Sequence, residues 1–279
     1  EFGQEDSRLL GPDNMNATLW RQQARDYLVA SLTLAALLDS VQTLASQRNP
    51  YAVDLTPLGF NPMHDYIKIS SDEGYWNLYR QKDLAKPKAY MRQPKGLFDV
   101  SGHTSQALDE LKEVIRLCRQ HGIKLHLFTY PYHAHLLEII RITGHWPAFE
   151  TWKRTVVQVL ADDASAANKP AFEFWDFSAF NSVTSETIPP RGDRNTQMLY
   201  YWEAGHFKKE LGNLMLDRML LQSVQPAEFG VLLTPANVDA QIAAVKLQGD
   251  QYRSTHSQEI EELVGLTKRA PMNIQKKIR

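Results

Sequence analysis

The sequence lacks several features that would assign it to a class of protein. Cys118 is its only cysteine, so no disulfide can form within the chain, and the paired cysteines of a structural zinc site are absent. Lysines and arginines number 31 against 32 acidic residues, which gives a net charge of −1. Because phosphate binding needs a concentrated basic surface, nucleic acid is not expected as a partner.

Long apolar runs are also missing. A membrane-spanning helix needs roughly 18 or more consecutive apolar residues; the closest run, 27–38, is too short and ends at Asp39. No segment has the form of a signal peptide. The chain begins with Glu1 rather than methionine, which is compatible with a cut from a longer chain, so a missing signal says little about location. No glycine-rich phosphate loop follows a predicted strand, and no cofactor is expected.

Hydrophobic residues make up 43% of the chain, enough for a sizeable core. Residues 18–44 have apolar positions at helical spacing and predict a buried core helix. Residues 66–95 mix aromatic and charged side chains without clear periodicity, and Pro87 and Pro94 interrupt them. This second stretch predicts a surface lid or insertion.

Residues 101–120 form the clearest amphipathic helix in the sequence. Their apolar positions recur at helical spacing, and Gly122 is placed to end the helix. Three residues are candidates for its N-cap: Ser101, Thr104 and Ser105. An apolar segment, 123–129, follows at once and predicts a buried strand, an order typical of parallel α/β architecture.

The same alternation continues along the chain. We expect helices at 134–143 and 149–160, a second strand at 171–177, and a last helix that begins after His206 and runs to about Leu221. The fold class predicted is therefore α/β, a three-layer domain with a mostly parallel sheet. We assign residues 1–225 to this domain and the more polar residues 226–279, which end basic, to a helical C-terminal extension.

Polar side chains gather where the predicted strands end. His133 follows the first strand, Asp176 ends the second, and Glu203 and His206 precede the last helix. In open parallel sheets, ligands bind outside the carboxyl ends of the strands. We therefore expect these residues to border one site, with His133 and Asp176 contacting substrate.

Glu203 and His206 carry the sharpest hypothesis. A carboxylate three residues before a histidine can bond one ring nitrogen while the other faces a nucleophile. The plain alternative is an acid and a surface histidine that stabilise a helix start. The neighbouring Tyr201 and Trp202 are candidates for a sugar-stacking surface, or equally for core.

Other candidates have plain alternatives as well. His133 and His135 could bind a metal only if both faced one ion; residues two apart on an extended loop point to opposite sides, so no metal site is expected. Asp176 could equally bond backbone amides and hold its loop. Lys153 is expected on a helix face with no role in the site.

With these motifs, the region 100–221 resembles the C-terminal half of the SGNH (GDSL-like) hydrolase superfamily, in particular the membrane-anchored SGNH-like proteins of bacterial envelopes. There a late strand ends in an acid, and an Asp-x-x-His loop precedes the last helix. Here Asp176 and the Glu203–His206 segment occupy those places, with glutamate in place of aspartate. The resemblance implies that His206 is a general base and Glu203 its orienting acid.

The resemblance also implies a function. The chain would belong to an esterase or O-acyltransferase that acts on an acylated cell-envelope glycan or similar ester, in the envelope or periplasm. The family's serine block, Gly-Asp-Ser-like or Gly-x-Ser after the first strand, has no match here, so the serine is expected upstream of residue 1. The alternative is a non-catalytic SGNH-like protein that binds a glycan or a membrane-bound acyltransferase partner.

Overall fold

The computed structural model describes residues 17–268, apart from 53–54, 57–58, 60, 93–95, 98–104, 222–225 and 227. The chain divides into two compact units, residues 1–65 and 66–279, and each is described by itself. The expected boundary after residue 225 lies within the second unit, whose residues 226–268 contribute one strand and two helices.

The first unit contains two helices, α1 (Ala17–Leu32) and α2 (Leu34–Ser46). Thr33 separates them because its backbone is extended and its Oγ1 accepts a hydrogen bond from the amide of Ala36, at 3.1 Å, as an N-cap. The helical prediction for 18–44 is confirmed, but its assignment to the core is wrong. Most of the large apolar side chains are exposed, among them Leu28, Leu32, Leu34, Leu37, Leu38, Val41 and Leu44.

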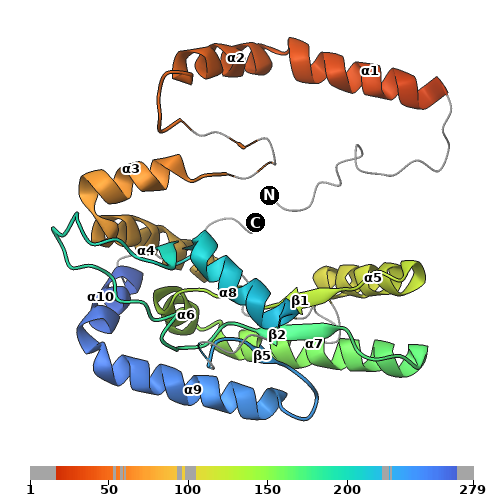
Figure 1. Cartoon of the computed structure of the whole chain (residues 1–279), viewed down its shortest axis with the longest axis vertical. Coiled ribbons are helices and arrows are strands. Elements are labelled where there is room, and N and C mark those ends of the chain that lie inside the picture. The colour runs from red at the N-terminus through yellow and green to blue at the C-terminus, as the bar shows by residue number, and fades with distance from the viewer. Residues whose placement is uncertain are drawn as a thin grey trace, which may run out of the picture. The chain divides into compact units, whose positions relative to one another are not determined.

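The second unit is built mainly of helices (Figure 1). They are α3 (His64–Glu73, which begins just before the unit boundary), α4 (Tyr75–Arg92), α5 (Gln106–His121), α6 (Ala134–Ile142), α7 (Trp146–Ala167), α8 (Lys209–Leu220), α9 (Val238–Thr255) and α10 (Ser257–Lys268). The strands are β1 (His126–Phe128), β2 (Glu173–Asp176), β3 (Tyr201–Glu203), β4 (His206–Phe207) and β5 (Val231–Leu232).

The predicted three-layer, mostly parallel α/β fold is wrong. The structure is 62% helical and, in its described part, has sheets of only two or three strands. β1 and β2 are adjacent and parallel, as expected, but β5 pairs antiparallel with β2. β3 and β4 form a separate antiparallel pair. Only two apolar segments have the length and pattern of buried strands, and most of the remaining apolar periodicity is helical, so the sheet stays small.

Local sequence signals determine where α5 begins and ends before β1. The Ser105 hydroxyl accepts the amide of Leu108 and caps α5. Gly122 ends the helix in the left-handed conformation, at φ 64°, which glycine adopts without steric penalty. β1 follows within four residues, as the sequence predicts.

Alternate residues of the sheet enter two apolar clusters. Leu127 and Phe174 face one cluster with side chains from α5, α7 and α9. Trp175 faces the other with side chains from α4, α6, α8 and α10. Figure 1 shows α8 on one side of β2 and α7 on the other. Burial on both faces explains why β2 reads as a continuous apolar run.

The lid predicted for residues 66–95 is instead two helices, α3 and α4. Gly74 makes the bend between them at φ 85°, and a Cβ there would lie 2.4 Å from the carbonyl oxygen of Asp193. Pro87 lies inside α4, where it removes one backbone hydrogen bond. Tyr75, Leu78 and Tyr79 bury that helix in the core, and this packing outweighs the poor local pattern.

Candidate functional site

The turn between β3 and β4 brings Glu203 and His206 together. Ala204 and Gly205 form a two-residue connection, so the acid and the histidine are directly paired across the hairpin. Nδ1 of His206 donates a hydrogen bond to Oε1 of Glu203. The structure thus forms the contact that their spacing predicts.

The carboxylate of Glu203 is fully buried and has three donors. Its Oε2 accepts hydrogen bonds from Nζ of Lys86, at 2.7 Å, and from the amide of Gly205, at 3.0 Å. Burial by itself raises the pKa of this carboxyl, but the bond from His206 and the charge of Lys86 more than offset it and lower the pKa to about 2. Glu203 is therefore an anion throughout the neutral range.

The imidazole of His206 lies at the surface, with 52% of its side chain exposed. Tyr66 of α3 covers part of it in an edge-to-face contact, with ring centroids 5.5 Å apart. Among the described residues, none is hydrogen-bonded to Nε2 of His206. The helix-capping alternative is not what forms, because Lys208 is the N-cap of α8 and Glu203 faces the histidine and the lysine. The arrangement can hold a neutral imidazole with Nδ1 as donor and Nε2 as acceptor.

Tyr201 and Trp202 lie beside the pair without forming a joint surface. Tyr201 is completely buried and donates its hydroxyl proton to the carbonyl of Pro131, at 2.7 Å. Trp202 is half-buried beneath the ammonium of Lys208, 4.3 Å from the ring centroid. Tyr201 is thus a core residue in this structure, the plainer of the two interpretations of its sequence.

Asp176 is buried at the end of β2 and fully bonded. It accepts hydrogen bonds from the hydroxyl of Thr129, from Nζ of Lys153 and from the amide of Ser178, at 2.8, 2.8 and 3.1 Å. This geometry matches the structural alternative, in which Asp176 holds its loop. Lys153, expected on a helix face, is instead buried as the partner of Asp176.

His133 is also buried rather than placed at a mouth. Its Nδ1 accepts the amide of His135, at 3.2 Å, so Nε2 carries the proton and donates to the carbonyl of Glu186, at 2.8 Å. Burial first, then the charge of His135, lowers the pKa of His133 to about 3. His133 is therefore a neutral group that caps α6, and its amide bonds Ala204 of the hairpin turn at 3.1 Å.

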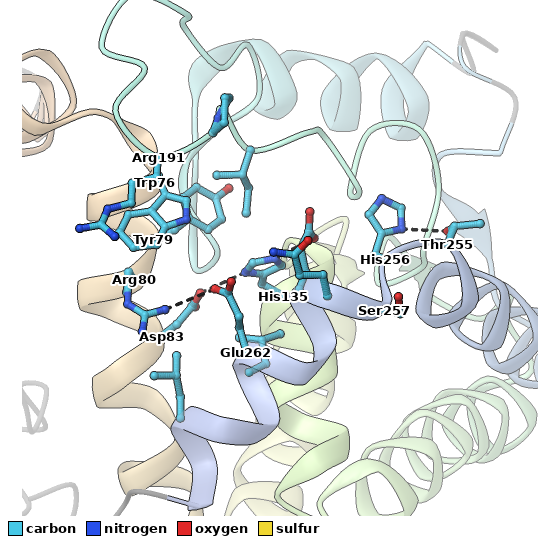
Figure 2. Close-up of a pocket in the computed structure, with 16 residues that line it drawn as sticks. Trp76, Tyr79, Arg80, Asp83, His135, Arg191, Thr255, His256, Ser257 and Glu262 are labelled. Carbon is cyan, nitrogen blue, oxygen red and sulfur yellow. Dashed lines mark hydrogen bonds and ion pairs between the residues drawn. The ribbon is translucent and has the colours of Figure 1, made fainter.

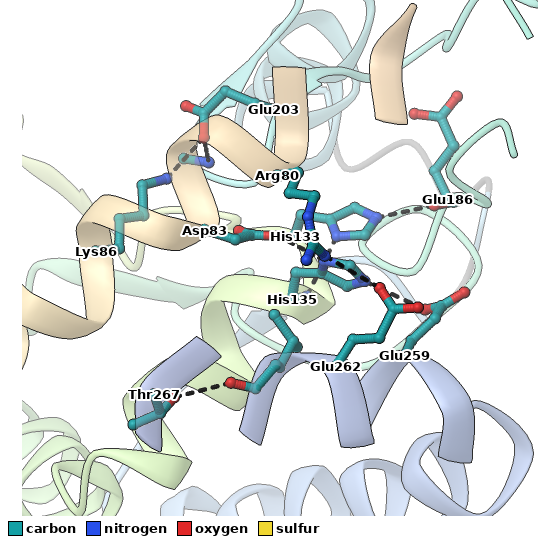
Figure 3. A network of polar contacts seen from close by, with 12 residues as sticks. Arg80, Asp83, Lys86, His133, His135, Glu186, Glu203, Glu259, Glu262 and Thr267 are labelled. Carbon is teal, nitrogen blue, oxygen red and sulfur yellow. Dashed lines mark hydrogen bonds and ion pairs between the residues drawn. The ribbon is translucent and has the colours of Figure 1, made fainter. Parts of the chain in front are cut away.

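His135 belongs to a cluster that the sequence did not single out. Its Nδ1 donates to Asp83 of α4, at 3.0 Å, and its Nε2 to Glu259 of α10, at 3.2 Å. Burial lowers the pKa of His135, but the bonds to the two carboxylates outweigh it and raise the pKa to about 9. Figure 3 shows this network alongside the contact between Lys86 and Glu203. The partners lie 52 and 124 residues away, so spacing gave no signal.

A cavity of about 740 Å³ lies between α4, α10 and the loop before β3 (Figure 2). Trp76 is on its wall, with the guanidinium groups of Arg80 and Arg191 within 5.3 Å of its ring centroid. The acids Glu259 and Glu262 line the α10 side. Neither Glu203 nor His206 reaches this cavity, so the pair and the cavity are separate sites.

The described residues lack two further features. No cluster of three or more histidine, cysteine, aspartate or glutamate side chains has the geometry of a metal site. No described helix combines the length and apolar character that crossing a bilayer requires. Comparisons with models of protein families, with curated proteins and with solved structures found no match to this chain.

Proposed function

We propose that this chain carries the histidine–carboxylate part of the active site of an esterase or O-acyltransferase. His206 is the general base, and Glu203 orients it through Nδ1. The observation that supports this is the pairing of a buried, ionised carboxylate with an exposed imidazole whose Nε2 has no described partner. An imidazole held in this way can take a proton from an attacking hydroxyl and return it to the leaving group.

The chemistry has two half-reactions. A serine hydroxyl attacks the ester carbonyl while Nε2 of His206 takes its proton, and the ester's alcohol leaves with that proton. Water or a second alcohol then releases the acyl group, and His206 acts as base again. The substrate class we propose is an acylated cell-envelope glycan, with the serine supplied from outside residues 1–279. An envelope location is part of the same proposal.

The order of elements supports this assignment beyond the pair itself. Strand β2 ends in Asp176, the Glu203–His206 hairpin follows, and α8 begins at Lys209. This is the order on which the resemblance to SGNH hydrolases depends. The support comes from that order and from the geometry of the pair, because the sheet itself is too small to serve as evidence.

The decisive experiment measures ester cleavage by the full-length gene product and by residues 1–279, with p-nitrophenyl acetate and an O-acetylated oligosaccharide as substrates. We expect His206→Ala to lower kcat by about 10³-fold or more in the active form, with little change in KM. His121→Ala is the matched control, since that exposed histidine in the last turn of α5 belongs neither to the hairpin nor to the cavity lining and should leave kcat unchanged. If His206→Ala cleaves ester at the wild-type rate, or neither form cleaves it, the proposal is wrong.

A second candidate function is the binding of a glycan without catalysis. The cavity beside Trp76 favours it, because planar polar side chains and an aromatic wall suit a neutral polyhydroxylated ligand. Calorimetric titration with the same oligosaccharide after de-O-acetylation separates the two functions. Binding that Trp76→Ala abolishes and His206→Ala leaves intact, in a protein without esterase activity, would favour this candidate.

A further inference from the structure

Lys86 is the third member of the Glu203–His206 group. It projects from α4 and reaches Glu203 across 117 residues of sequence, with Nζ 2.7 Å from Oε2. We propose that Lys86 is a positioning residue that orients the Glu203 carboxylate toward His206 and limits how strongly that carboxylate holds a proton on the ring. This inference rests on the proposed function for its biological meaning, but its test does not.

The first argument is geometric. A carboxylate free to rotate offers either oxygen to a histidine, whereas here Oε2 is occupied by Lys86 and by the amide of Gly205. Oε1 is then the oxygen left for Nδ1 of His206. Lys86 therefore fixes the carboxylate's rotation, and through it the plane of the imidazole.

The approach of the lysine depends on a residue without a side chain. A Cβ on Gly205 would lie 2.5 Å from Nζ of Lys86 and 3.3 Å from Oε1 of Glu203. A side chain at this turn position would force the ammonium of Lys86 away from its present place. The sequence of the turn thus serves the lysine as well as the hairpin.

The second argument is electrostatic. A lone buried carboxylate would strongly favour the imidazolium form of a bonded histidine, and a histidine already charged is not a base. Lys86 bonds that carboxylate, and its positive charge offsets part of the carboxylate's negative charge. The imidazolium form of His206 is therefore stabilised less than it would be beside an unpaired carboxylate.

The surroundings contain few other charges. From α3 the ring meets Tyr66, over whose face the ammonium of Lys82 lies, 4.7 Å from the ring centroid. The phenols of Tyr130 and Tyr132 lie on the loop after β1. Burial, and to a smaller extent the negative charge of Glu203, raise the pKa of both, to about 12 for Tyr130. Both phenols are therefore neutral at neutral pH. Lys86 is the cation that bonds the carboxylate directly.

The same contacts would also exist if Lys86 only stabilised the hairpin. A structural role predicts that replacing Lys86 loosens the hairpin without a defined direction of change in the titration of His206. A positioning role predicts a direction: loss of the lysine charge moves the titration to higher pH, and loss of the carboxylate charge moves it to lower pH.

The experiment follows the Cε1–H NMR signal of His206 as a function of pH in residues 1–279, with the signal assigned by its absence in His206→Ala. Lys86→Gln keeps an N–H donor to Oε2 but removes the charge, and Lys86→Arg keeps both. We expect the titration midpoint to rise by about 0.5 to 1 pH unit in Lys86→Gln, to stay within about 0.2 in Lys86→Arg, and to fall in Glu203→Gln.

A midpoint in Lys86→Gln that equals the wild-type value, or that falls as in Glu203→Gln, would overturn the inference. If Lys86→Gln does not fold, wild type and Lys86→Arg still test the inference. An ion-paired Glu203 predicts a midpoint that changes little between 0.01 and 1 M salt in both proteins, whereas a marked fall of the midpoint with salt in both would mean that Glu203 acts as a lone anion and would overturn the inference. None of these readings depends on esterase activity. An inactive protein with the expected titration would reject the proposed function and leave this inference standing.

Discussion

His206 and His135 each donate a hydrogen bond to a buried carboxylate, yet their environments differ in two respects. The side chain of His206 is 52% exposed and meets one carboxylate, which a lysine also bonds. The side chain of His135 is 10% exposed and lies between two carboxylates, Asp83 and Glu259. Contact with a carboxylate therefore does not by itself make a histidine a base.

Exposure and the number of acids decide the outcome. Two carboxylates stabilise the imidazolium of His135, whose pKa rises to about 9, and both ring nitrogens are engaged. His135 is therefore a buried cation that joins α6 to α4 and α10. The side chain of His206 is half exposed, no described residue bonds its Nε2, and its carboxylate partner is also bonded by a lysine. These are properties that the base we propose would need.

The largest expected effect is on stability, through His135. His135→Ala leaves the buried carboxylate of Asp83 without its cation and removes a partner of the partly exposed Glu259, so we expect the free energy of unfolding to fall by about 3 kcal/mol. Urea denaturation followed by circular dichroism measures this. A loss below about 1 kcal/mol would show that Asp83 and Glu259 find other partners. His135 would then contribute no more to stability than we expect of His206.

The pH dependence of stability sharpens the same contrast. The pKa of His135 is about 9 in the folded protein and 6.5 for an ordinary histidine, so the folded state binds the extra proton. Its contribution, about 3 kcal/mol, is fully present below pH 6.5 and is lost as the pH rises through about 9. Unfolding free energies measured from pH 6 to 10 should fall in wild type more than in His135→Gln. Parallel curves for the two proteins would contradict a charged His135.

The loss of stability at low pH depends on the ionisation of Glu203. Its pKa is about 2 in the folded protein against 4.5 for an ordinary glutamate, so the unfolded state binds the extra proton in between. The contribution is present above pH 4.5 and is lost as the pH falls through about 2; because Lys86 is partly exposed, we expect about 2 kcal/mol. Thermal unfolding of wild type and Glu203→Gln between pH 2.5 and 6 measures it. The difference between them should shrink as the pH falls.

The smallest effect is expected for His206 itself. Because its ring is half exposed, His206→Ala should change the free energy of unfolding by less than about 1 kcal/mol, in the range of surface substitutions. The same urea denaturation provides the comparison with His135→Ala. If His206→Ala lowered the free energy of unfolding as much as His135→Ala, His206 would be a structural residue like His135.

Several local features could be predicted from the sequence because nearby residues determine them. Ser105 and Gly122 bound α5, and the apolar segments that follow give two adjacent parallel strands. The contact between Glu203 and His206 was also predictable, since a two-residue turn leaves those side chains opposite each other. In each case the partners lie within a few residues, or the signal is a strong local pattern.

Other features were not predictable for the opposite reason. Nothing near Lys153 in the sequence indicates Asp176, and nothing near His135 indicates Asp83 or Glu259. The sequence overpredicts the sheet because strong local signals at two strands do not require further strands beside them. It does not predict the helices in residues 66–92 because their packing depends on partners far away in the sequence.

Backbone preferences and short spacing are enough to predict which segments are helical or extended around β1, and that Glu203 and His206 meet across a turn. The tertiary structure alone decided that Lys86 bonds Glu203, that His135 is enclosed by two acids, and that Tyr201 is core. Burial and the pairing of charges arise only when segments far apart in the chain pack together, and these set the protonation state of each histidine.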